Sequence, residues 1–166
     1  HRELVSQVES DFNFNPDLNL EVFEIGQSPN SILSKVVRKM EEIFLEFAPS
    51  LTLVQGDTTS AMATAVASAN CRIPVGHVEA GLRSFDNSSP FPEEINRKII
   101  SQVAEYHFCP TGLSKDNLVL ENIQTDKIYV VGNTGLDAAR IMIETHGESI
   151  IDWKESISEL GKFIFV

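Results

Sequence analysis

A strand, a turn and the start of a helix can be recognised in Leu51-Thr52-Leu53-Val54-Gln55-Gly56-Asp57-Thr58-Thr59-Ser60. The apolar run 51–54 predicts a buried strand, Gly56 permits a tight turn, and the alanine-rich stretch 61–69 predicts a helix. A second strand is predicted where the chain reads Pro74-Val75-Gly76-His77-Val78. A strand, a helix and another strand in this order are typical of a βαβ unit with parallel strands.

The same alternation of helical and extended periods continues in both directions. Toward the N-terminus it predicts a helical stripe from Leu4 to Phe12, a short strand at 20–23, and a long amphipathic helix that opens at Ser28-Pro29. Toward the C-terminus it predicts helices and strands in turn, at 93–103, 106–109, 113–121, 127–131 and 136–144. We therefore predict an α/β fold, in which a Rossmann-like parallel sheet carries helices on both faces.

The composition changes after His146-Gly147. A polar, acidic helix is predicted over 149–160, and the apolar residues 163–166 read as the start of a new buried strand. We expect residues 1–147 to form an N-terminal Rossmann-like domain, and residues 148–166 to be a linker helix and the first strand of a C-terminal domain. Because the chain begins without an initiating methionine or an apolar signal region, we expect it to start inside a longer protein.

Composition limits the classes of function. The chain has 166 residues, 42% of them hydrophobic, which is the profile of one soluble globular domain, and no apolar run approaches a membrane span. A net charge of −11 argues against a nucleic-acid surface, although a few arginines and helix N-termini can still hold an anion. Cys71 and Cys109 lie far apart, as expected for reduced thiols in a cytoplasmic protein. The four histidines are also scattered, so we predict no metal site.

Three carboxylates are the strongest candidates for chemistry. Asp57 follows the first strand of the βαβ unit, Glu79 ends the second, and Glu93 opens a helix directly after Pro92. Parallel strands end at one edge of the sheet, where ligands of open α/β sheets bind. Neighbouring carboxylates repel, so one stays protonated while another ionises. We therefore predict an acid/base set at that edge.

Structural roles stay open for the same residues. The alternatives are helix capping, ion pairing and a place in the core; they concern Asp57 or Thr58 as a cap, Glu79 with Arg83 and Glu93 with Arg97 as ion pairs, Glu94 at a helix start, and His77 as a core histidine. A further turn, Gly132-Asn133-Thr134-Gly135, could present N–H groups to a phosphate or could be a plain turn capped by Thr134.

Four motifs taken together resemble one enzyme family. They are Gln55-Gly56-Asp57-Thr58-Thr59, His77-Val78-Glu79-Ala80-Gly81-Leu82-Arg83, Ser89-Pro90-Phe91-Pro92-Glu93-Glu94-Ile95-Asn96-Arg97 and Gly132-Asn133-Thr134, and their order and spacing are similar to those of the non-hydrolysing UDP-N-acetylglucosamine 2-epimerases. The resemblance implies two Rossmann-like domains facing across a cleft, as in GT-B enzymes. It also implies interconversion of UDP-GlcNAc and UDP-ManNAc, by elimination and re-addition of UDP through a 2-acetamidoglucal.

The resemblance assigns roles to particular residues. It implies that Asp57, Glu79 and Glu93 are catalytic; the residues implied to contact substrate are Thr58, His77, Arg83, Arg97, Asn133 and Thr134. It implies no cofactor and no metal, a homodimer and a cytoplasmic location. The family's first strand and a catalytic histidine of its second domain fall outside residues 1–166. The loop 84–88 departs from the family's commoner glycine-containing version.

Three other functions stay open. A hydrolysing relative would release free ManNAc, and a GT-B glycosyltransferase would pass a sugar to an acceptor. The third alternative is a non-catalytic module that binds a sugar nucleotide or dimerises. We expect residues 1–166 to be inactive alone, because catalysis needs water excluded and the diphosphate held by domain closure.

Overall fold

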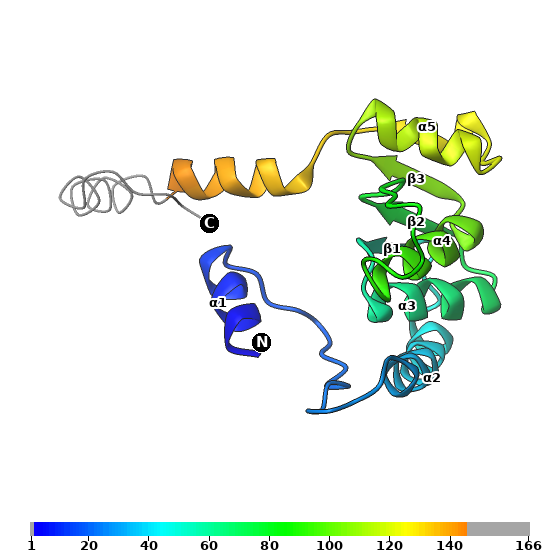
Figure 1. Ribbon diagram of the computed structural model, residues 1–166. Coiled ribbons are helices and arrows are strands. Elements are labelled where there is room, and N and C mark those ends of the chain that lie inside the picture. Colours follow the sequence, from blue (N-terminus) through cyan, green and yellow to red (C-terminus); the bar gives the residue numbers. More distant parts are fainter. Residues whose placement is uncertain (1, 146–166) are drawn as a thin grey trace.

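The computed structural model describes residues 2–145, with side chains described from Ser6 onward (Figure 1). The elements are α1 (Arg2–Asp11), α2 (Pro29–Phe47), β1 (Thr52–Gln55), α3 (Thr59–Asn70), β2 (Val75–Val78), α4 (Glu93–Val103), β3 (Tyr106–Cys109), α5 (Gly112–Leu120), a 3-10 turn (Thr125–Lys127) and β4 (Ile128–Val130). Residues 134–145 are also helical. The predicted domain boundary at 147, the helix 149–160 and the last strand lie outside the described residues.

The four strands form one parallel sheet in the order β1-β2-β3-β4. The prediction of a parallel α/β sheet is therefore confirmed, and the carboxyl ends of all four strands lie along one edge. The strand predicted at 20–23 is wrong: these residues pair with no strand in the described part of the chain. A strand needs a neighbour for its backbone groups, and here the Leu20 carbonyl accepts from the Lys39 ammonium instead.

The core lies between the sheet and the helices α3, α4 and α5. Two clusters of buried side chains fill it: Val54, Met62, Ala65, Val75 and Ile100 under α3 and α4, and Ala80, Cys109, Leu118 and Ile128 under α5. Leu33 brings α2 against the first cluster. Ala65 of α3 is fully buried against Val54 and Val75 of the strands, and its small side chain allows the helix to approach them closely. The alanine-rich stretch is thus the centre of the helical layer.

The opposite face of the sheet carries apolar side chains that remain accessible. Leu53 is 61% exposed and Tyr129 is 44% exposed, while the rings of Phe108 and Tyr129 stack at 5.7 Å. The helices that pack on the sheet within residues 2–145 all lie on the other face, and α1 lies apart from the sheet (Figure 1). The helices predicted on both faces are therefore seen on one face only in this range, because the strands follow one another in order and each crossover returns on the same side. None of the described helices is long and apolar enough to span a membrane.

The turn after β2 is clamped to α5 through Gly81. Its φ of +83° is in the left-handed region, and a Cβ added here would lie 2.1 Å from the Ser114 carbonyl oxygen. Asn117 of α5 donates to the Gly81 carbonyl at 2.9 Å. Backbone meets backbone at this point, so neither side can move away from an added methyl group.

Two histidines, His77 of β2 and His107 of β3, lie side by side in the sheet and are each 1% exposed. The Nε2 atom of His77 lies 2.8 Å from the Gly56 carbonyl, so it carries the proton and donates. Burial lowers the pKa of both rings to about 4; the Arg83 charge also lowers both, and the backbone acceptors Gly56 and Ala104 only partly oppose this. Both rings are therefore neutral near pH 7.

We predict that Gly81→Ala destabilises the chain by about 3 kcal/mol or more, because alanine adds a backbone clash to an unfavourable φ. Gly112→Ala is the matched control: an added Cβ there meets nothing within 4 Å at the start of α5. Its effect should stay within about 1 kcal/mol. Urea unfolding of both variants measures the difference, and equal stability of the two would contradict the clamp.

We also predict that the free energy of unfolding falls as the pH drops from about 6.5 toward 4. In this window the unfolded chain protonates both histidines while the folded chain keeps them neutral, so acid favours unfolding. Each ring should contribute a loss of about 2 kcal/mol between pH 7 and pH 5. Urea titrations at several pH values measure the loss. NMR titration of His77 and His107 with midpoints near 6.5 would disprove the explanation.

Candidate active site at the carboxyl edge of the sheet

The turns that carry two of the predicted catalytic carboxylates adjoin at Gly56. The Gly56 N–H donates to the Val78 carbonyl at 3.0 Å, which extends the pairing of β1 and β2 to the edge. A Cβ built on Gly56 would lie 3.5 Å from Oε2 of Glu79, so this carboxylate lies over the glycine. Asp57 is the next residue. The Asp57 and Glu79 turns are thus neighbours at the strand ends, and the convergence of their carboxylates stays a prediction.

The first turns of α4 hold the Asp57 turn in place. Arg97 reaches Oδ2 of Asp57 with Nη2 at 2.6 Å and Nε at 2.9 Å, and Asn96 donates to the Asp57 backbone carbonyl at 2.8 Å. Glu93 is half-buried and lies one turn before Arg97, so it opens the helix that grips Asp57. The alternative of a Glu93–Arg97 ion pair is wrong, because Arg97 pairs with Asp57 and Glu94.

Glu79 has a strained backbone. Its φ is +67°, a conformation that side chains with a Cβ rarely adopt. Such strain costs on the order of 1–3 kcal/mol and is concentrated at functional sites. The neighbours compensate, since the buried Ala80 donates its N–H to the Phe108 carbonyl at 3.0 Å and Gly81 is clamped by α5. The fold therefore holds the Glu79 backbone at a fixed place on the edge.

The three carboxylates have unlike surroundings. Asp57 contacts a guanidinium directly, Glu79 stands on a strained turn over bare glycine backbone, and Glu93 belongs to the positive N-terminal turn of a helix. The three carboxylates therefore differ in the groups that lie next to them.

Arg83 lies inside the domain, with a fully buried side chain. It pairs in bidentate fashion with Glu121, at 2.6 and 2.7 Å, and donates further to Ser101 and to its neighbour's carbonyl. The alternative of a Glu79–Arg83 ion pair is therefore wrong, because Arg83 pairs with Glu121 instead. Glu121 lies 38 positions away in the chain, so no local spacing indicated it. His77 is likewise turned inward, toward the Gly56 carbonyl.

Glu94, assigned only to a helix start from the sequence, is a fully buried carboxylate. It accepts from the N–H groups of Ser84 and Phe85 at 3.0 and 3.1 Å and from Nη1 of Arg97 at 3.2 Å. Burial by itself raises the pKa of Glu94, but the N–H donors and the Arg97 and Arg83 charges outweigh it and hold the pKa below its ordinary value. The sequence showed the charge but not its partners.

The remaining predicted site residues are accessible and lie in turns. Thr58 caps α3 by accepting from the Ala61 N–H at 3.1 Å, which confirms the capping alternative. Thr134 is not a cap: Asn133 takes that role by accepting from the Gly135 N–H at 2.8 Å. Gln55 at the end of β1 donates to the Thr134 hydroxyl at 3.1 Å. This bond brings the 132–135 turn to the same edge as Asp57.

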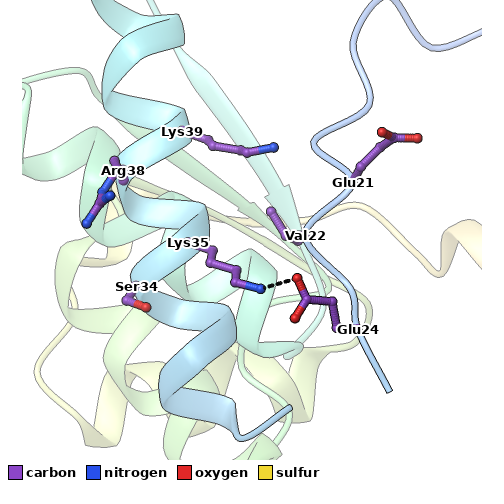
Figure 2. A pocket seen from close by; sticks show the side chains of 7 residues that line it. All are labelled: Glu21, Val22, Glu24, Ser34, Lys35, Arg38 and Lys39. Atoms are coloured by element: carbon purple, nitrogen blue, oxygen red, sulfur yellow. Dashed lines mark hydrogen bonds and ion pairs between the residues drawn. The ribbon is translucent and has the colours of Figure 1, made fainter. Parts of the chain in front are cut away.

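A cavity of about 330 Å³ lies elsewhere, between residues 21–24 and α2 (Figure 2). Its lining includes Lys35 and Glu24, which form an ion pair at 2.6 Å and point toward each other in Figure 2. None of its lining residues belongs to the carboxyl edge. Within residues 2–145, no group of three or more histidine, cysteine, aspartate or glutamate side chains is placed to hold a metal ion.

Comparison with known proteins gives one consistent family. The family model described as UDP-N-acetylglucosamine 2-epimerase matches residues 1–165. The chain is 45% identical over 138 residues to UDP-N-acetylglucosamine 2-epimerase of Escherichia coli K12, which covers 83% of this chain and 37% of that protein. It is 44% identical over 138 residues to the Bacillus subtilis enzyme of the same name, of which it covers 36%. The chain thus spans well under half the length of these relatives.

Solved structures agree with this family. The crystal structure of UDP-GlcNAc 2-epimerase from Neisseria meningitidis bound to UDP-GlcNAc superposes with a TM-score of 0.85 at 38% identity, over 95% of this chain and 43% of that one. The UDP-GlcNAc 2-epimerase from Methanocaldococcus jannaschii superposes with a TM-score of 0.79 at 36% identity, over 86% and 39%. With its parallel sheet, its carboxylate edge and these matches, the chain belongs to the UDP-N-acetylglucosamine 2-epimerase family.

Proposed function

We propose that the protein to which this chain belongs is a non-hydrolysing UDP-N-acetylglucosamine 2-epimerase, which interconverts UDP-GlcNAc and UDP-ManNAc. The observation that carries the proposal is that the turns of Asp57 and Glu79 adjoin at Gly56, while Arg97, from the helix that Glu93 opens, pairs with Asp57. The names of the relatives support it, and so does the Neisseria meningitidis structure, in which that epimerase is bound to UDP-GlcNAc.

The chemistry asks for carboxylates in unlike settings. The C2 proton of the sugar is not acidic, so a base removes it while the C1–O bond to UDP breaks and positive charge develops at C1. This elimination gives a 2-acetamidoglucal. Protonation of C2 on the other face and re-addition of UDP complete the inversion. We assign the proton transfers to Asp57, Glu79 and Glu93; elimination followed by addition needs no redox cofactor.

The six proposed substrate residues divide by exposure. Thr58, Asn133 and Thr134 are exposed in turns at the carboxyl edge, and the partly buried Arg97 lies behind Asp57. We propose that these four contact the sugar or the diphosphate, since backbone N–H groups at helix starts suit anions. His77 and Arg83 are buried, and we propose that they support the site from within by holding the Gly56 carbonyl and the 82–83 backbone.

The chain spans well under half the length of its relatives, so the proposed enzyme includes more than these residues. We propose a second domain that closes over the edge in a GT-B arrangement, a homodimer, and a cytoplasmic location. Closure would exclude water and hold the diphosphate, so residues 1–166 alone should show no turnover.

We predict that the reaction of the protein as its gene encodes it, run in D₂O, places one deuterium at C2 of UDP-ManNAc with the nucleotide still attached. The reason is that a carboxyl group exchanges its proton with solvent between removal and return. Mass spectrometry and proton NMR of the product measure the label.

Each alternative function has its own outcome in that experiment. A hydrolysing epimerase would accumulate free ManNAc and UDP, and a glycosyltransferase would convert nothing until an acceptor is added. A redox epimerase would retain the original hydrogen at C2, because it leaves and returns as hydride. An unlabelled C2 would therefore remove the acid/base role from these carboxylates.

We predict that Glu79→Gln lowers kcat by about 10²–10⁴-fold, since an amide cannot take up the proton that the carboxylate accepts. Glu105→Gln is the matched control: Glu105 is an exposed carboxylate that pairs with Lys127 at 2.8 Å, and it directly precedes β3 at the opposite edge of the sheet. Steady-state kinetics of both variants decide the matter. A Glu79→Gln enzyme with nearly normal kcat would exclude Glu79 from proton transfer.

A further inference from the structure

The Glu94 carboxylate is buried more deeply than a helix start requires. A carboxylate in the first turn of a helix gains from the helix dipole while it remains in water. Glu94 is instead 0% exposed and receives N–H bonds at both oxygens, from Ser84 and Arg97 at Oε2 and from Phe85 at Oε1. Burying a charge is costly unless it is paired and hydrogen-bonded. The contacts that Glu94 makes outside its own helix turn therefore explain why it can be buried.

Its partners come from two different parts of the site. Ser84 and Phe85 begin the exposed loop 84–91, which leaves the Glu79 turn directly, and Phe85 has a φ of +62°. Arg97 belongs to α4 and contacts Asp57 with its other nitrogens. One carboxylate therefore joins the segment that follows Glu79 to the guanidinium that fixes Asp57.

Arg97 without Glu94 would have several orientations available. Its contacts with Asp57 all converge on the single oxygen Oδ2, so they fix the plane of the guanidinium less firmly than contacts with both carboxylate oxygens would. The bond from Nη1 to Glu94 fixes the plane of the group. In the same way, the Phe85 backbone holds its left-handed φ with an N–H anchored on Glu94.

We propose that Glu94 is a positioning residue, whose buried carboxylate locks the 84–91 loop and the Arg97–Asp57 pair into one rigid arrangement. It does not touch the substrate. The inference rests on the proposed epimerase function for its kinetic part, whereas the link between Glu94 and the loop can be tested without catalysis.

The test uses Glu94→Gln in the protein as its gene encodes it. The amide keeps the size of the side chain, but its NH₂ group cannot accept a bond, so one N–H donor loses its partner. Hydrogen exchange at the Ser84 or the Phe85 amide should become about 10- to 100-fold faster, since that amide loses its bond to a charged acceptor. The kcat should fall by about 10- to 100-fold with KM changed less than about threefold, as expected for misplacement of reacting groups.

Glu94→Asp is the second variant, and it serves if Glu94→Gln does not fold. It keeps the charge but is one methylene shorter, so it cannot reach the loop and Arg97 at once; it should lose protection at Ser84 or Phe85 and also lower kcat. Glu105→Gln is again the control, because it removes an exposed ion pair far from the loop. Exchange at the loop amides and kcat should both stay at wild-type values in this control.

The outcomes are distinct. Unchanged protection of Ser84 and Phe85, or a kcat within about twofold of wild type, in a folded Glu94 variant would overturn the proposal. Exchange that rises evenly across the whole chain would reduce Glu94 to a general stabilising role and overturn it too. A wild-type protein that does not epimerise would reject the proposed function and the kinetic part of this inference, while the exchange result would still decide whether Glu94 locks the loop.

Discussion

The ion pair between Arg97 and Asp57 is the contact on which the candidate site depends. It ties α4 to the turn after β1, and with the Asn96 bond to the Asp57 carbonyl it fixes where the helix begins relative to the sheet. Glu93 and Glu94 take their places from that helix. The geometry of the edge therefore follows from one guanidinium, held between a carboxylate at the surface and a carboxylate in the interior.

Beneath this edge the domain keeps an unusual number of polar groups away from water. Arg83 pairs with Glu121, and His77 supports Gly56 as a neutral ring. Buried polar groups with incomplete partners destabilise a fold, and Nδ1 of both His77 and His107 has no partner in the described part of the chain. The hydrogen-bonded polar groups make the domain rigid, because each of them has few alternative arrangements. A site that moves protons between fixed positions benefits from such a base.

The local hydrophobic pattern predicted the fold well, because a short run of residues determines each strand and helix. Periodicity correctly placed two helices and a strand: the helices that begin at Ser28-Pro29 and at Glu93, and the strand at 106–109. The strand at 20–23 failed because a strand exists only with a neighbour, and no local signal supplies one. The catalytic edge was likewise predictable, since strand ends converge. Glu121 and the partners of Glu94 were not, because contacts between distant residues leave no mark in local spacing.

The left-handed backbone at Glu79 bears on how such a protein can be improved. Glycine accepts that conformation without strain, so a search for thermal tolerance alone would favour glycine at this position. The same change deletes the carboxylate that the site holds over Gly56. Under the proposed function, stability and activity compete for this single residue, so a directed-evolution campaign would have to measure turnover in every round or lose the function as stability rose.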